Sequence, residues 1–125
     1  MEEDLFGPLR FPGIFQSQNP PHIDVTIGYN FAMKMLERVY ETIRARRAQP
    51  KEGSYTNYLQ NAGLDKMLKK VAEESGELII AAKNSEPQRL IEETADLYFH
   101  TLVVLEEKGI TLSQINDELE KRHKA

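Results

Sequence analysis

The chain contains no cysteine among its 125 residues. Disulfide bonds, a thiolate nucleophile and a cysteine-ligated zinc site are therefore excluded. No stretch approaches the roughly 18 apolar residues that a membrane-spanning helix requires, so no membrane association is expected. The first residues, Met1-Glu2-Glu3-Asp4, are acidic where an export signal would be basic. We therefore expect a cytoplasmic protein.

Positive charge is also in short supply. The sequence has 20 acidic and 16 basic residues, which gives a formal net charge of -4. This balance provides no basic field that would attract a nucleic-acid backbone, so no nucleic-acid partner is predicted. A small anionic substrate such as a nucleotide would need a metal ion or a few well-placed cations.

The prolines and glycines indicate how the chain is organised. Residues 1–30 contain four of the six prolines and three of the seven glycines, which argues against a regular helix there. Large apolar side chains lie among them, so this segment is expected to pack on the domain or on a partner chain, with a flexible extension as the alternative. We predict a proline-rich extension over residues 1–30 and one helical domain over residues 31–125.

From Phe31 onward the apolar residues recur at helical spacing, as in Phe31, Met35, Val39 and Ile43. Glycine, proline and serine signals then separate four further predicted helices, over about 55–61, 66–84, 87–108 and 113–122. Asp65 is expected to cap the second of these and Ser85 the third. No segment alternates with a period of two for long enough to predict a sheet. The sequence therefore predicts an all-α antiparallel helix bundle, and the apolar surplus on its two central helices suggests completion by homodimerisation.

Each of the two central helices carries a pair of acidic residues three positions apart. Glu74 and Glu77 lie on the first of them, and Glu93 and Asp96 lie on the second. Because each helical residue advances roughly 100°, each pair occupies one face, which borders the predicted apolar face of its helix. Packing of the two apolar faces would bring all four carboxylates to one seam.

Such carboxylates repel one another, and partial removal from water raises the cost. A hard divalent cation such as Mg²⁺ relieves this repulsion, since it prefers carboxylate and water oxygens. We therefore predict a magnesium site formed by Glu74, Glu77, Glu93 and Asp96. On geometry alone, a solvated acidic surface remains the alternative. Gly76 adds weight to the site, because glycine inside a helix costs roughly 1 kcal/mol and a close approach of backbone or ligand would compensate.

The acidic residues also carry a resemblance to known proteins. The pattern Glu73-Glu74-x-x-Glu77 followed by Glu93-x-x-Asp96 resembles the signature of the all-α nucleotide pyrophosphohydrolases related to MazG and dimeric dUTPases. Within that superfamily, the chain is similar to the phosphoribosyl-ATP pyrophosphatases of histidine biosynthesis over about residues 34–123. The motifs that carry this closer resemblance are Ser54-Tyr55-Thr56, Lys70-Val71-x-Glu73-Glu74, Ala95-Asp96-Leu97-x-x-His100 and Arg122-His123.

The resemblance implies hydrolysis of phosphoribosyl-ATP to phosphoribosyl-AMP and pyrophosphate by a Mg²⁺-activated water, in a homodimer. Glu73 would accept a proton from that water, and Lys70 would contact a phosphate. His100 would contact the substrate or support the metal ligands, and Arg122 would reach the second phosphoribosyl group. The remaining predicted substrate contacts are the hydroxyl groups of Ser54, Tyr55 and Thr56.

Each of these roles has a simpler alternative. Glu73 would also be an ordinary charge on a helix surface, and Lys70 would also form a helix-surface ion pair with Glu74, four residues later. Ser54 or Thr56 would also cap a helix. His100 would also tether a helix in the core, and Arg122 would also end one in solvent. Two rival functions remain open as well, a MazG-like house-cleaning nucleoside triphosphate pyrophosphohydrolase and a non-catalytic helical interaction module.

Overall fold

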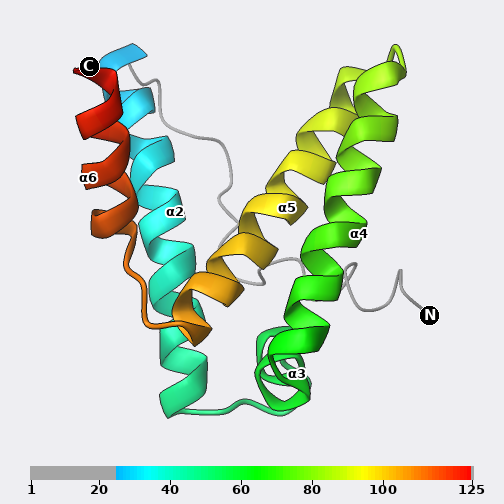
Figure 1. Ribbon diagram of the computed structural model, residues 1–125, viewed down its shortest axis with the longest axis vertical. Helices are drawn as coiled ribbons and strands as arrows, with labels where there is room; N and C mark the ends of the chain where they lie inside the picture. Colours follow the sequence, from blue (N-terminus) through cyan, green and yellow to red (C-terminus); the bar gives the residue numbers. More distant parts are fainter. Residues whose placement is uncertain (1–24, 125) are drawn as a thin grey trace. The chain divides into compact units, whose positions relative to one another are not determined.

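A computed structural model describes the backbone of residues 25–124 and the side chains of residues 34–124. These residues form five α-helices and no strand, which confirms the predicted all-α class (Figure 1). In chain order the helices are α2 (Val25–Ala48), α3 (Tyr55–Ala62), α4 (Leu64–Lys83), α5 (Pro87–Glu107) and α6 (Leu112–His123). Within the described part of the chain, no helix has the length and apolar character needed to cross a membrane. Residues 1–24 of the predicted extension lie outside the described residues.

Helix α2 begins at Val25, six residues before its predicted start at Phe31. The prediction that residues 1–30 contain no regular helix is therefore wrong for the last six of them. Proline bars the helix only as far as Pro21, and a glycine such as Gly28 is tolerated inside a helix at a cost of roughly 1 kcal/mol. The chain divides into two compact units between Asn57 and Tyr58, and α2 belongs to the first of them.

One buried amide organises the turn between α2 and α3. The Asn57 side chain donates from Nδ2 to the carbonyl oxygen of Arg46 at 2.8 Å, and its Oδ1 accepts from the backbone N–H of Lys51 at 2.8 Å. Gly53 allows the sharp change of direction between these partners, because its φ of 79° is strained for any other residue type. The Asn57 side chain thus joins the end of α2 to the start of α3.

In the second unit, α4 and α5 form an antiparallel hairpin and pack side by side (Figure 1). Their buried apolar side chains form the core of this unit, with Val103 fully buried and Met67 1% exposed. Both helix starts differ in detail from the prediction. Gly63, not Asp65, occupies the position before α4, and Glu86, not Ser85, the position before α5. Pro87 stands in the first turn of α5, where its missing N–H has no cost.

Helix α6 has a well-formed start and an exposed body. The hydroxyl of Thr111 accepts from the backbone N–H of Gln114 at 3.2 Å, and the Gln114 side chain accepts from the backbone N–H of Thr111 at 2.8 Å. This reciprocal arrangement is a capping box, which satisfies two N–H groups that a helix start leaves unpaired. None of the residues of α6 is buried.

Gly76 lies inside α4, and a Cβ placed on it would meet no described atom within 4 Å. The close backbone approach suggested by the sequence is therefore not provided by the described residues of this chain. We expect Gly76→Ala to stabilise the protein by about 0.5–1 kcal/mol in urea unfolding, because alanine favours the helix at no steric cost.

The reverse change at a neighbouring exposed position, Ala72→Gly, is the matched control and should destabilise by a similar amount. A loss of stability in Gly76→Ala would contradict the expectation, and would indicate that a second chain or a ligand lies against Gly76.

Candidate metal centre

The hairpin brings together three of the four predicted metal ligands. Helix α4 provides Glu74, and α5 provides Glu93 and Asp96. One carboxylate oxygen from each lies within 4.8 Å of the others, and the three residues are only 5–7% exposed. The three-residue step from Glu93 to Asp96 places both on the face of α5 that packs against α4. We refer to Glu74, Glu93 and Asp96 as the carboxylate cluster.

Glu77 does not join this group. It lies one turn beyond Glu74 on α4, but its side chain is exposed. A step of three residues turns a helix through roughly 300°, so Glu77 is rotated from Glu74 by about 60° and falls on the solvent side of the seam. Its role as a fourth ligand stays a prediction.

The electrostatics of the cluster explain why it suits a cation. Burial raises the pKa of Glu74 from 4.5 to about 8, helped by a hydrogen bond with Glu93 and by the charges of Asp96 and Glu93, while Lys70 opposes the shift. Without a cation, Glu74 therefore stays protonated at neutral pH, and its O–H donates a hydrogen bond to Glu93. A divalent cation can replace that proton, and carboxylate oxygens are the donors that hard cations prefer. The donor set fits Mg²⁺.

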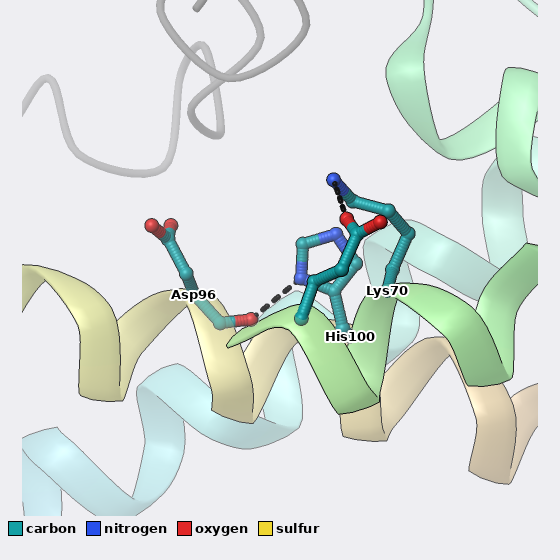
Figure 2. Close-up of polar contacts among 4 residues, drawn as sticks. Lys70, Asp96 and His100 are labelled. Carbon is teal, nitrogen blue, oxygen red and sulfur yellow. Dashed lines mark hydrogen bonds and ion pairs between the residues drawn. The ribbon is translucent and has the colours of Figure 1, made fainter. Parts of the chain in front are cut away.

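Lys70 and Glu73 form an ion pair beside the cluster. Lys70 is 3% exposed, and its Nζ donates to Oε2 of Glu73 at 3.0 Å (Figure 2). This hydrogen bond, followed by the charge of Lys70, lowers the pKa of Glu73 and keeps the carboxylate ionised. The simpler alternative for Lys70 was a helix-surface ion pair with Glu74, four residues later; the observed pair is instead with Glu73, three residues later, and Lys70 is buried. The predicted catalytic roles of both residues, and the phosphate contact of Lys70, stay predictions.

His100 is 1% exposed and contacts the backbone of a cluster residue. Its Nδ1 lies 2.7 Å from the carbonyl oxygen of Asp96, one turn earlier on α5 (Figure 2). Burial lowers the pKa of His100 to about 4, so the ring is neutral at pH 7. Because a carbonyl only accepts, Nδ1 carries the hydrogen and donates it. His100 thus braces the turn of α5 that carries Asp96, which fits the core tether as well as a support of the metal ligands. Its roles in supporting the metal ligands and in binding substrate stay predictions.

The other predicted substrate contacts lie elsewhere in the chain. Ser54, Tyr55 and Thr56 belong to the first unit, whereas the cluster belongs to the second, and Tyr55 is buried at 3% exposure. Arg122 is exposed on α6 and its Nε donates to Oε1 of Glu118 at 2.8 Å. Their roles in substrate binding stay predictions.

Ser54 shows the capping role that was its alternative. Its Oγ accepts from the backbone N–H of Asn57 at 3.2 Å, immediately before the first residue of α3, as an N-cap does. We expect Ser54→Ala to lower the free energy of unfolding by about 1 kcal/mol in urea titrations. Ser113→Ala is the control, because Ser113 lies in the first turn of α6, two residues after the N-cap Thr111. An unchanged stability with a raised KM would contradict the capping role and favour substrate binding.

Arg89 is a residue of the site that the sequence prediction missed. Its Nη2 lies 3.1 Å from Oε1 of Glu93, one turn later on α5. The four-residue spacing between the two was a usable signal, because side chains at this spacing are neighbours on a helix. The same spacing between Lys70 and Glu74 was recognised on the other helix.

Fold and site together define an all-α protein whose central hairpin holds a buried carboxylate cluster suited to a divalent cation. Comparison with known families goes further. The profile of the phosphoribosyl-ATP pyrophosphohydrolase family matches residues 36–123, and the chain belongs to this family. The resemblance predicted from the sequence motifs is thereby confirmed.

Individual relatives agree with the family match. The chain is 56% identical over 90 residues to the phosphoribosyl-ATP pyrophosphatase of Lactiplantibacillus plantarum. The aligned residues cover 72% of this chain and 85% of the relative. It is 58% identical over 88 residues to that of Listeria welshimeri, with 70% and 84% covered. The histidine biosynthesis bifunctional protein HisIE of Caldanaerobacter subterraneus is 49% identical over 92 residues, which cover 74% of this chain and 45% of that protein.

Proposed function

We propose that this protein hydrolyses phosphoribosyl-ATP between the α and β phosphates, releasing phosphoribosyl-AMP and pyrophosphate, with Mg²⁺ held by the carboxylate cluster. The observation that carries the proposal is the convergence of three buried carboxylates on the α4–α5 hairpin, inside the region that matches the family. The names of the relatives support the substrate and a place in histidine biosynthesis.

The hairpin residues divide the work between binding and proton transfer. Glu74, Glu93 and Asp96 would hold the cation, and Glu77 would reach it from the next turn of α4. A bound Mg²⁺ supplies neutralisation of the triphosphate and a lowered pKa for a coordinated water. Glu73, which Lys70 keeps ionised, is placed next to Glu74 in the sequence and would accept the proton of the attacking water.

A pyrophosphate-release assay on phosphoribosyl-ATP, with Mg²⁺ and with a chelator, tests the proposal. We expect release that depends on the cation, and little turnover of ordinary deoxynucleoside triphosphates in the same panel. Rapid hydrolysis of the deoxynucleotides with none of phosphoribosyl-ATP would favour the MazG-like alternative. A wild-type protein that binds no Mg²⁺ in calorimetry would favour the interaction module instead.

We also propose that the protein is a homodimer. Large apolar side chains are exposed on both hairpin helices, which is unusual for a helix face that meets only water. They are Leu68, Ile79 and Ile80 on α4, and Ile91 and Tyr98 on α5, and each is 47–63% exposed. Light scattering during gel filtration should give twice the mass of one chain, and Ile80→Glu should shift it toward the monomer. A monomeric wild-type protein at micromolar concentration would contradict this proposal.

The cytoplasmic location predicted from the sequence stays a prediction.

A further inference from the structure

Arg89 forms a salt bridge with a buried residue of the carboxylate cluster and is itself half exposed to solvent. In its salt bridge with Glu93, the Glu93 side chain is 8% exposed and the Arg89 side chain is 49% exposed. One end of the pair is therefore part of the buried cluster, and the other end lies at its edge. The pair is therefore not an ordinary surface ion pair, in which both partners are exposed and the contribution to stability is small.

The guanidinium group of Arg89 has more hydrogen-bond donors than its contact with Glu93 uses. Arginine carries five N–H donors in a planar fork and keeps its charge at any pH the protein meets. The contact with Glu93 at 3.1 Å is made by one nitrogen, Nη2, and the Arg89 side chain is half exposed, so solvent reaches it. A planar fork of this kind matches the oxygens of a phosphate group.

The negative charge of the carboxylate cluster favours a positively charged side chain at its edge. The three cluster carboxylates carry a formal charge of -3 when ionised, and one divalent cation leaves -1. A polyphosphate that approaches this site adds further negative charge, which another cation at the edge would offset. Arg89 occupies that edge.

We propose that Arg89 is a phosphate-binding residue of this site, which pairs with Glu93 when no cation is bound and binds a phosphate of the substrate once a cation occupies the cluster. The inference rests on the proposed function for the identity of the substrate. It assigns to Arg89 two successive partners, the Glu93 carboxylate and then the polyphosphate.

The two partners predict opposite effects of removing the arginine. Without phosphate, Arg89 competes with the cation for Glu93, so its loss should strengthen cation binding. With the cation in place, Arg89 attracts the polyphosphate, so its loss should weaken polyphosphate binding. A solvated surface ion pair without a role in the site would leave both affinities unchanged.

Calorimetric titrations of the full chain separate these effects without any turnover. MgCl₂ alone should bind Arg89→Gln about threefold more tightly than the wild type, as expected from loss of a nearby charge. Inorganic pyrophosphate, titrated at saturating Mg²⁺, should bind Arg89→Gln about tenfold more weakly. Arg44→Gln, at an exposed arginine of α2, is the matched control and should change neither affinity. Arg89→Lys keeps the charge but not the fork, so its pyrophosphate affinity should be intermediate.

The proposal is overturned if folded Arg89→Gln, checked by circular dichroism, shows no gain in Mg²⁺ affinity or no loss in pyrophosphate affinity. Absence of Mg²⁺ binding in the wild type would overturn it as well. Arg89→Gln could show both changes in affinity while the wild-type protein fails to hydrolyse phosphoribosyl-ATP. That result would refute the proposed substrate and leave the role of Arg89 in place.

Discussion

Replacing Glu74 by glutamine should reduce pyrophosphate release from phosphoribosyl-ATP about a hundredfold or more. Glu74 provides the carboxylate oxygen with which α4 contributes to the cluster, and it is 5% exposed, so water cannot take its place easily. Glutamine keeps the size and one oxygen of the side chain but removes its charge. The assay is initial-rate pyrophosphate release at saturating Mg²⁺.

The same substitution should stabilise the metal-free protein, which separates loss of a ligand from loss of the fold. Glutamine needs no proton to remain neutral, whereas burial and the neighbouring carboxylates force Glu74 to hold one. Glu41→Gln, at an exposed glutamate of α2, is the control for charge and should keep the wild-type rate. A near-normal rate in Glu74→Gln would rule out the proposed metal centre.

The metal-free protein should lose stability as the pH rises from about 6.5 to 8, and Mg²⁺ should restore it. The pKa of Glu74 is about 8 in the folded chain against its usual 4.5. In the pH interval between these values the folded state binds more protons than the unfolded state. Stability contributed by Glu74 is thus complete below pH 4.5 and falls as the pH rises toward 8, by roughly 1.4 kcal/mol per pH unit at most.

His100 acts in the opposite sense over part of this range. Its pKa is about 4 in the folded chain against its usual 6.5, so its contribution is complete above pH 6.5 and is lost as the pH falls toward 4. The two effects oppose each other between pH 4.5 and 6.5. Above pH 6.5 the slope due to Glu74 stands alone.

Urea unfolding between pH 6.5 and 8 is therefore the informative measurement. The metal-free wild type should become less stable across this interval, and Glu74→Gln should show a flatter profile. Mg²⁺ should stabilise the wild type more at pH 8 than at pH 6.5, because cation binding displaces the proton. A pH-independent stability of the metal-free wild type would contradict the proton held by Glu74.

The sequence predicted the helices well because their apolar residues recur at a period that only a helix satisfies. Boundaries were less accessible. The start of α2 at Val25 was missed because proline and glycine were given equal weight as helix breakers, although only proline removes a hydrogen-bond donor. Gly63 and Glu86 before α4 and α5 were missed because both helices start without a side-chain cap, so the usual capping signal misleads.

The candidate site was accessible to the extent that it depends on helix geometry. Two acidic pairs at three-residue spacing were enough to expect Glu74, Glu93 and Asp96 in one place, once the apolar faces were known to pack. Sequence spacing does not set how far each helix is rotated about its own axis, and that rotation leaves Glu77 exposed. Arg89 was overlooked because a charged residue one turn from another is common on helix surfaces, and its importance depends on the burial of its partner.

The cluster is built from two consecutive helices joined by a short connection, and this has a consequence for how the protein folds. Contacts between segments close in the sequence form quickly, because little chain entropy is lost when the intervening loop closes. The ligands of the candidate site therefore meet as soon as the α4–α5 hairpin forms, without waiting for α2 or α6. A cation bound at that stage would stabilise the hairpin. The concentration of the cation would then affect both the folding rate and the unfolding rate of the chain.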